Sequence, residues 1–403
     1  MPSLPMVRGR SGPGLLAHVL VSKYADHLPL YRQSEIYARE GVDLDRSTMA
    51  DWVGKAAPLM RPLLDALIRH VMTAERLHND DTPVPVLAPG AGRTKTCRLW
   101  VYARDAVPFA GMAPLAVLFR YTPDRRGEHP RAHLAGFRGI LQADGCAGFA
   151  GLYQNGAVQE AAGWANARSN FHDGHEATKS TLAEEAVERI AALYAIERDI
   201  RSTSPAERQR TRATRSEPLM QDTHHWLPPH CAASRARARS QARSATASCA
   251  GKRCPPVRDG RACLDNNSAE RAIRPVALGE RTTCLPGGER AAAIYSLITT
   301  AKLNGRDPEA YLRTMPGHYS TPSIDGRTAA LEYTPTLTCP TSSRIGPQSP
   351  ADAYVGPAHP AFKARSHTCR RGTISRVRTE ITMGIDTEPK TTSWTGIPAS
   401  TAS

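Results

Sequence analysis

The order of the short apolar segments between residues 76 and 143 limits the fold of this chain more than any other feature. Runs rich in β-branched and aromatic residues occur at Arg76–Leu87, Arg98–Ala103 and Ala116–Tyr121, separated by turn-prone segments, and predict a three-stranded meander. A helix-like stretch, Glu128–Phe137, precedes a nearly continuous apolar run, Gly139–Ala143, that is typical of a buried strand. Because the first and fourth strands of such an order can lie side by side, the sequence predicts an α/β domain built on a mixed sheet.

A small helical region is expected before the sheet. Between residues 15 and 72 apolar residues recur at helical spacing and predict three or four short helices. Ser47 and Thr48 are candidate helix caps, and Arg46–Lys55 could form the second helix of a helix-turn-helix that contacts DNA. Packing within a helical bundle is the alternative, and it is favoured because helix pairs are common whereas pairs that contact bases are rare.

Further helices are predicted after the sheet. The segment Lys179–Arg201 is amphipathic and begins with a capping box formed by Thr181 and Glu184. Another helix is expected to start near Asp265, capped by one of the next three residues, and one more covers Glu289–Asn304.

Three acidic side chains are candidates for chemistry. Asp80 lies in the first predicted strand, and Asp144 directly follows the fourth. If these strands are neighbours, the two carboxylates lie close together and repel each other unless a cation lies between them. Glu270, on a later helix, would complete a site for two Mg²⁺ ions. Taken singly, Asp144 is also an ordinary turn residue and Glu270 an ordinary carboxylate in the first turn of a helix.

The chain resembles bacterial transposases of the insertion-sequence-66 family in several long blocks. These blocks are HNDDTPVPVLAPGAGRTKT, YTPDRRGEHPRAHLAGFRGILQADGCAGF, and LDNNSAERAIRPVALG followed by GGERAAAIYSLITTAKLNGRDPEAYL. The resemblance covers about residues 3–227 and 257–313, and blocks of this length are far more specific than a short motif. It implies an RNase H-like fold with an Asp-Asp-Glu metal triad, which falls on Asp80, Asp144 and Glu270.

The resemblance also implies a reaction and its partners. Water and then a freed 3′-hydroxyl would attack a phosphodiester in line, while Mg²⁺ or Mn²⁺ ions held by the triad neutralise the developing charge. The expected partner is double-stranded DNA, both transposon ends and target, and the protein is expected to form a homo-oligomer that works with accessory proteins of the same element. Arg168, Arg271 and Arg274 are the candidate contacts to DNA phosphates.

These expectations divide the chain into four parts. A helical region, 1–72, precedes an RNase H-like catalytic domain, 73–280, which contains a helical insertion at about 155–262. C-terminal helices follow at 281–313, and residues 314–403, rich in Ser, Thr, Pro and Gly, are expected to be a disordered tail.

Departures from the family pattern lead to a hypothesis of damage. The family's Cys-Trp-x-His-x-Arg-Arg-Lys-Phe block is altered at Gly163–Phe171, which leaves Arg168, and its N-terminal extension is missing, as expected of a truncated chain. Residues 228–258 hold seven basic and no acidic side chains and cannot form a core face. We interpret this segment, of family-like length, as the product of a shifted reading frame. An insertion damaged in this way would fail to pack and would expose its apolar face.

Charge and composition exclude some classes of protein. The net charge of +14 favours a polyanionic partner, but residues 226–403 hold 24 basic and 13 acidic side chains, a net of +11, where the sequence has the weakest core pattern. The sequence has no run of roughly 18 apolar residues, and residues 1–14 have no apolar stretch, so neither a membrane span nor a secretory signal is expected. The nine cysteines include no CxxC pair, so reduced thiols and a cytoplasmic location are expected.

Three functions remain open from the sequence. The first is a transposase that cleaves and transfers DNA strands. The second is a catalytically inactive remnant that binds DNA or oligomerises, and the third is an RNase H-like nuclease that cuts without strand transfer. Cleavage, DNA binding and joined products separate the three.

Overall fold

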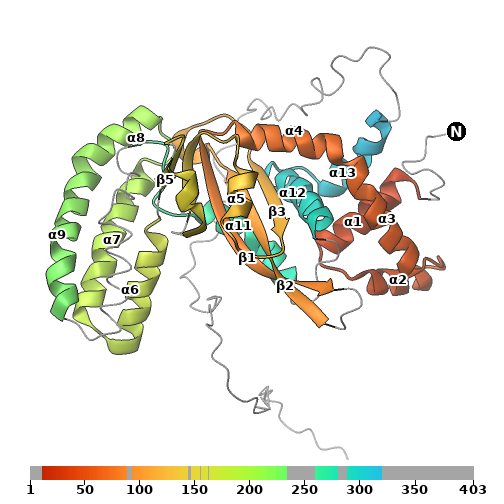
Figure 1. Cartoon of the computed structure of the whole chain (residues 1–403), viewed down its shortest axis with the longest axis horizontal. Helices are drawn as coiled ribbons and strands as arrows, with labels where there is room; N and C mark the ends of the chain where they lie inside the picture. Colours follow the sequence, from red (N-terminus) through yellow and green to blue (C-terminus); the bar gives the residue numbers. More distant parts are fainter. Residues whose placement is uncertain are drawn as a thin grey trace, which may run out of the picture. The chain divides into compact units, whose positions relative to one another are not determined.

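A five-stranded mixed sheet forms the centre of the structure (Figure 1). The structure is a computed structural model that describes residues 11–88, 93–143, 147–154, 156–161, 163–233, 259–279 and 288–319. The strand order is β3-β2-β1-β4-β5. The strands are β1 (Arg76–Ala88), β2 (Arg93–Arg104), β3 (Ala116–Thr122), β4 (Gly139–Ala143) and β5 (Val158–Ala161).

The pairing of the strands confirms the predicted neighbours. Strands β1, β2 and β3 form an antiparallel meander, whereas β4 is parallel to both β1 and β5. In the parallel pair, Asn79 on β1 lies opposite Ala143 on β4. Four of the five residues of β4 are buried, as expected for its apolar sequence. The strand β5 was not predicted, because Val158–Ala161 is short and two of its four residues are polar.

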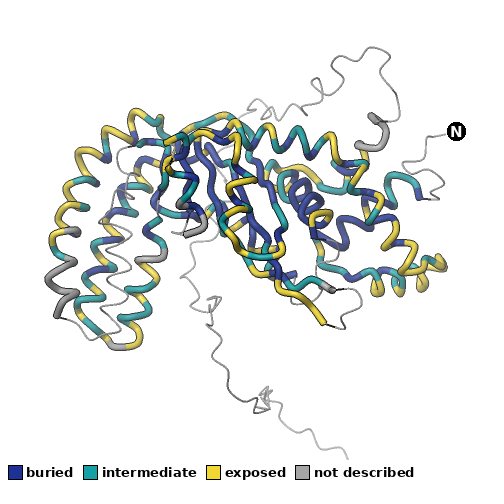
Figure 2. The backbone as a smooth tube through the Cα atoms, viewed as in Figure 1, coloured by how far each residue is buried: buried dark blue, intermediate teal, exposed yellow. Residues whose placement is uncertain are grey.

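Helices before and after the sheet share one hydrophobic core with it. Buried side chains from the N-terminal helices, from the strands and from the later helices form a single cluster, which includes Leu20, Met49, Leu99 and Ile294. The backbone of both the strands and the neighbouring helices has buried stretches (Figure 2). The N-terminal helices are α1 (Pro13–Tyr24), α2 (Leu30–Arg39), α3 (Arg46–Leu59) and α4 (Arg61–Met72). The later helices are α11 (Asn267–Gly279), α12 (Glu289–Leu303) and α13 (Pro308–Tyr319). Because the core is continuous, the N-terminal helices are part of the same compact body as the sheet.

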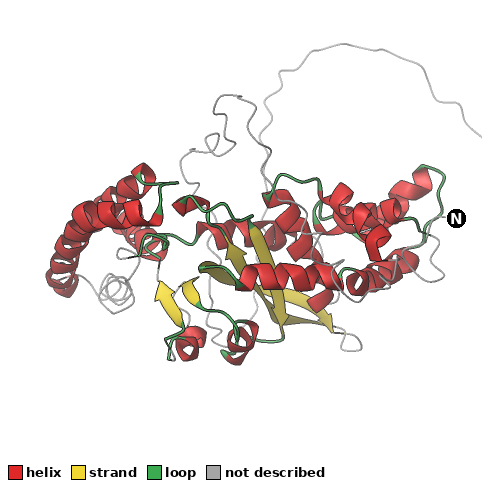
Figure 3. Cartoon of the chain, turned by 90° about the horizontal axis from the view of Figure 1, so that it is seen from above, coloured by secondary structure: helices red, strands yellow, loops and turns green. Residues whose placement is uncertain are grey.

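The predicted insertion is a group of helices at one end of the sheet. Seen from above, the strands lie between these helices and the N-terminal ones (Figure 3). Trp164, Ile190, Leu193 and Leu264 form a separate small core, so the insertion packs against the segment that precedes α11. The helices are α6 (Ala165–Thr178), α7 (Thr181–Asp199), α8 (Pro205–Thr211), the π-helical turn η3 (Arg212–Ser216) and α9 (Glu217–Ala233). Short elements on the other connections are η1 (Val107–Phe109), α5 (Glu128–His133) and η2 (Ala147–Leu152).

Two predicted helix caps are wrong. The N-cap of α7 is Ser180, which makes no side-chain capping bond, so the capping box of Thr181 and Glu184 does not form. The N-cap of α3 is Asp45, whose carboxylate accepts a hydrogen bond from the Ser47 amide at 2.8 Å. An acidic side chain in this position satisfies a free amide of the first turn, which explains why the helix begins before Ser47.

Several predicted features lie wholly or partly outside the described residues. These are Asp144, most of the segment 228–258, and the tail from residue 320 onward. The described part of the predicted tail is helical, because α13 continues to Tyr319. Likewise α9 continues to Ala233, beyond the expected start of the degenerate segment. Within the described ranges, no helix is both long and apolar enough to cross a membrane.

Candidate functional site

Asp80 lies at the centre of the sheet. It is on β1 opposite Val101 of β2, and its side chain is half-buried. One carboxylate oxygen accepts a hydrogen bond from the Asp81 amide at 2.7 Å. The parallel register pairs Asn79, directly before Asp80, with Ala143, directly before Asp144. Asp144 itself lies outside the described residues, so its distance from Asp80 stays a prediction.

The neighbouring carboxylate of Asp81 has a different environment. Its side chain is 5% exposed and accepts hydrogen bonds from Arg98 Nη1 at 3.0 Å and Arg125 Nη2 at 2.8 Å. Side chains alternate along a strand, so Asp80 and Asp81 point to opposite faces of the sheet. Because two guanidinium groups neutralise Asp81, its carboxylate is a poor candidate for a cation ligand.

Glu270 lies in the first turn of α11, which packs against β1 and β2. The helix buries Ala269, Ala272, Ile273 and Val276 in the main core, and Glu270 is half-buried on the flank of that face. The Glu270 amide donates to the Asn266 carbonyl oxygen at 3.2 Å. In NSAERAIRPVALG, apolar residues at helical spacing form the face that packs on the sheet. The carboxylate of Glu270 lies beside this apolar face.

A buried polar contact connects the two elements. The amide Oδ1 of Asn266 lies 3.0 Å from Nδ1 of His78, and its Nδ2 donates to the Asn79 carbonyl oxygen at 2.7 Å. His78 is on the same face of β1 as Asp80, two residues before it. Burial, followed by the nearby positive charges of Arg76 and Arg271, holds the pKa of His78 well below its usual value.

The segment leading to α11 is fixed by side chains from the sheet. The buried Arg76 of β1 donates through Nη1 to the Arg261 carbonyl oxygen and to Cys263 Sγ, each at 2.6 Å. Gln142 of β4 bonds both main-chain groups of Cys263, at 2.9 and 3.1 Å. The Leu264 carbonyl accepts from the Trp164 amide at 2.7 Å. These contacts determine where the chain enters α11.

Two buried arginines attach the same segment to the insertion. Arg208 and Arg212 are 1% and 0% exposed, and both donate to the carboxylate of Glu197 on α7, at 2.9 and 2.6 Å. The two guanidinium groups also donate to the carbonyl oxygens of residues 259, 260 and 262, and Arg208 Nη1 donates to that of Ile200. The described part of the insertion therefore packs against this segment, whereas most of the stretch interpreted as frame-shifted, 228–258, lies outside the described residues. The sequence could not reveal this contact, because arginines in ERQRTRATR resemble a solvated helix face.

The three predicted DNA-contacting arginines lie on two different elements. Arg168 is exposed on α6, with its guanidinium carbon 5.9 Å from the centre of the Tyr194 ring. Arg271 and Arg274 are exposed on α11, the helix that carries Glu270, and Nη2 of Arg271 is 3.9 Å from an Asp105 carboxylate oxygen. The structure thus brings two of the three arginines onto the same helix as a candidate metal ligand.

The donor chemistry of the candidate triad fits a hard cation. Asp80 and Glu270 offer carboxylate oxygens, the ligands that Mg²⁺ and Mn²⁺ prefer. Among the residues that the structure describes, no three His, Cys, Asp or Glu side chains gather as a metal cluster. The proposed second ligand, Asp144, lies outside those residues, so a complete triad is a matter for experiment.

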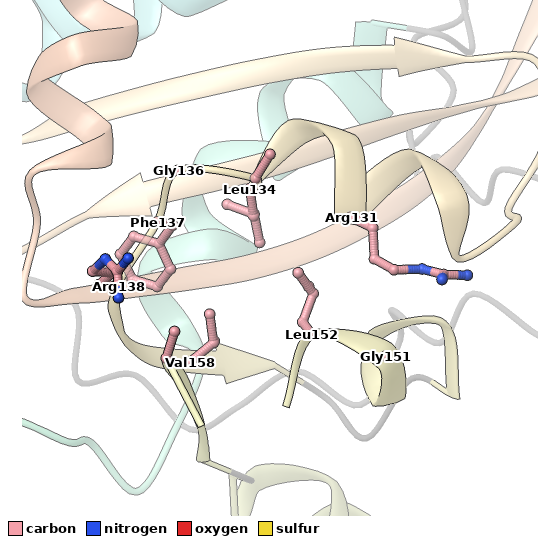
Figure 4. A pocket seen from close by; sticks show the side chains of 10 residues that line it. Arg131, Leu134, Gly136, Phe137, Arg138, Gly151, Leu152 and Val158 are labelled. Atoms are coloured by element: carbon pink, nitrogen blue, oxygen red, sulfur yellow. The ribbon is translucent and has the colours of Figure 1, made fainter. Parts of the chain in front are cut away.

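One cavity among the described residues lies away from this site. It has a volume of about 460 Å³ and is lined by apolar side chains, including Leu134, Phe137, Leu152 and Val158, with Arg131 and Arg138 at its rim (Figure 4). Residues 136–138 precede β4, whereas Asp144 follows it, so this cavity lies at the opposite end of that strand. A smaller cavity of about 80 Å³ adjoins the start of α11, next to Asp105, Asp265 and Arg271.

Comparison with known proteins shows the family. A family model described as "Transposase IS66 family" matches residues 8–294, which include the sheet and α11. The chain belongs to this family. The resemblance found in the sequence blocks is therefore confirmed, and membership in the IS66 family supports a transposase function.

Longer relatives occur in Sinorhizobium fredii (strain NBRC 101917 / NGR234). The "Uncharacterized protein y4hP" is 40% identical over 329 residues, which cover 76% of this chain and 59% of that protein. The "Uncharacterized protein y4jD" is 36% identical over 328 residues, which cover 77% of this chain and 63% of the relative. This IS66-family chain thus matches about three-fifths of the length of these relatives.

Proposed function

We propose that this chain is a DNA transposase that cleaves and transfers the strands of an insertion sequence, with Asp80, Asp144 and Glu270 as its metal ligands. The observation that carries the proposal is the parallel register of β1 and β4, in which the residues directly before Asp80 and Asp144 are partners. The helix with Glu270 packs on the same strand. Three antiparallel strands followed by two parallel ones support an RNase H-like assignment of this sheet.

The chemistry asked of the residues is mainly positioning. The three carboxylates would hold Mg²⁺ or Mn²⁺, which when bound lower the cost of charge on the attacking and leaving oxygens. Arg271 and Arg274 would contact DNA phosphates beside the scissile bond, because they extend from the same helix as Glu270. Transposon ends and target DNA are the proposed substrates, and a homo-oligomer with accessory proteins of the element is the proposed assembly.

Cleavage of a labelled transposon-end duplex tests the proposal. We expect cleavage with Mg²⁺ or Mn²⁺ and its loss in Asp80→Asn, which keeps the side-chain shape and removes the charge. Asp51→Asn is the matched control. It removes the same charge, but from an exposed side chain that pairs with Lys55 on α3. Equal cleavage by the wild-type protein and Asp80→Asn would contradict the assignment.

The main alternative is a catalytically inactive remnant that binds DNA. It is favoured by the altered block Gly163–Phe171, in which Arg168 is the remaining family-like cation. A remnant of this kind binds DNA with a strong dependence on salt but cleaves with neither metal. A nuclease without strand transfer gives nicks and no joined products in the same assay.

A further inference from the structure

Asn266 uses its side chain and its main chain to join two elements of the candidate site. The side chain is fully buried, and both ends of its amide form hydrogen bonds to β1, at His78 and Asn79. Its carbonyl oxygen accepts from the amides of Ala269 and Glu270, at 3.0 and 3.2 Å. The same residue therefore holds the strand that carries Asp80 and begins the helix that carries Glu270.

The hydrogen bonds determine which ring nitrogen of His78 takes part. Because Asn266 Nδ2 donates to a carbonyl oxygen, Oδ1 is the atom that faces His78, and an amide oxygen can only accept. His78 Nδ1 must therefore carry a proton. The other nitrogen, Nε2, is buried and has no hydrogen-bond partner in the described part of the chain. The contact between β1 and α11 thus depends on Nδ1.

Both candidate ligands lie a few residues after this contact along the chain, one on β1 and the other on α11. Asp80 follows His78 by two residues, about 7 Å along a strand, and Glu270 follows Asn266 by four residues, about 6 Å along a helix. The chain before Asn266 runs in the same direction as β1, since Arg76 bonds the carbonyl of residue 261 and His78 bonds Asn266. Asn266 therefore joins the strand that carries Asp80 to the first turn of the helix that carries Glu270.

We propose that Asn266 and His78 are positioning residues, which set the spacing between the carboxylates of Asp80 and Glu270 for a divalent cation. The role rests on the proposed function, because it takes both carboxylates to be metal ligands. Neither positioning residue contacts the metal itself. Removal of a residue that orients a metal ligand typically weakens metal binding about 10- to 100-fold.

The first measurement is the affinity of the full chain for Mn²⁺, by electron paramagnetic resonance of the free ion. We expect Asn266→Ala to weaken binding about 10-fold or more. The matched control is Asn304→Ala, because Asn304 is also an asparagine at a helix end and donates to the carbonyl oxygens of Leu115 and Thr300, although it is only part-buried. A loss that follows from weaker folding alone would appear in both variants.

A pair of substitutions at His78 tests the role of Nδ1. The amide nitrogen of asparagine takes the place of Nδ1, whereas that of glutamine reaches toward Nε2. We expect His78→Asn to keep Mn²⁺ affinity near the wild-type value and His78→Gln to weaken it as Asn266→Ala does. The reverse order would overturn the proposed contact.

Asp80→Asn separates failure of this role from failure of the proposed function. If the wild-type protein binds Mn²⁺ and Asp80→Asn does not, while Asn266→Ala and Asn304→Ala bind equally, the positioning role is wrong and the metal site stands. If the wild-type protein binds no Mn²⁺, or Asp80→Asn binds equally well, the proposed function fails and the positioning role fails with it.

Discussion

Glu197 is the side chain whose loss should most weaken the attachment of the insertion to the sheet. Its carboxylate accepts hydrogen bonds from Arg208 and Arg212, whose side chains are 2% and 0% exposed. Burial and the charge of Arg212 lower the pKa of Arg208, and Glu197 opposes this effect. Glu197→Gln keeps the shape of the side chain but leaves two buried cations without a neutralising charge.

The expected cost follows from this burial. Removing one partner of a buried ion pair typically lowers the free energy of unfolding by about 3–5 kcal/mol, because the other charge stays buried. Glutamine still offers one oxygen as an acceptor, so we expect a loss near the lower end, about 3 kcal/mol. A typical domain has a stability of about 5–15 kcal/mol, so the effect is large.

Urea unfolding measures this loss, with tryptophan fluorescence as the signal because Trp164 lies in the insertion's own core. Glu185→Gln is the control, since Glu185 pairs with Arg189 one turn away, with side chains 43% and 26% exposed. An exposed pair of this spacing contributes only about 0.3–0.5 kcal/mol. The midpoint should shift on the order of 1 M urea in Glu197→Gln and hardly at all in the control. Equal midpoints would refute the argument that buried guanidinium charge controls this attachment.

Three further predictions concern the sheet, the pH dependence and DNA binding. Gly139→Ala should lower the melting temperature, because φ is +143° and an added Cβ would lie 2.5 Å from a carbonyl oxygen, whereas Gly136→Ala, with open space around it, should not. Burial lowers the pKa of His133 from 6.5 to about 4, so on acidification this histidine takes up a proton in the unfolded chain before it does so in the folded chain. The free energy of unfolding should therefore fall between about pH 6.5 and pH 4, and it should fall less steeply in His133→Phe. Arg271→Ala should reduce the salt dependence of DNA binding by about one ion in filter-binding titrations, and an unchanged slope would exclude a phosphate contact.

The sheet could be predicted from sequence because its strands have a strong local pattern. The three short runs rich in β-branched and aromatic residues, followed by a helix-like stretch and the continuous apolar run Gly139–Ala143, indicate a meander and then a buried strand. From them follows the pairing of β1 with β4, and with it the neighbouring positions of two candidate ligands. By contrast, β5 has two polar residues among four, too little to distinguish from a loop.

The residues that hold the site could not be predicted, because their meaning depends on distant partners. Asn266 has the sequence context of a helix cap, and its partner His78 is 188 residues away. Arg212 has the context of a solvated basic helix, yet it opens a π-helical turn and is fully buried against Glu197. The local sequence around a buried polar residue is similar to that around an exposed one. Its burial depends on a hydrogen-bond partner that is distant in the sequence, and local periodicity does not identify that partner.

The contacts on residues 259–266 lead to a prediction about the segment before them. Arg76, Gln142, Arg208 and Arg212 bond this stretch from the sheet and from the insertion, so the start of α11 is fixed after residue 258. Replacement of residues 234–258 by a Gly/Ser linker of equal length keeps the side chains that form these bonds and the number of connecting residues, and the entropy of closing a flexible connection depends mainly on its length. We therefore expect the melting temperature and the Mn²⁺ affinity to stay close to those of the wild-type chain. A large loss of either would show that this basic segment contributes directly to the fold or to the site, and would argue against a shifted reading frame as its origin.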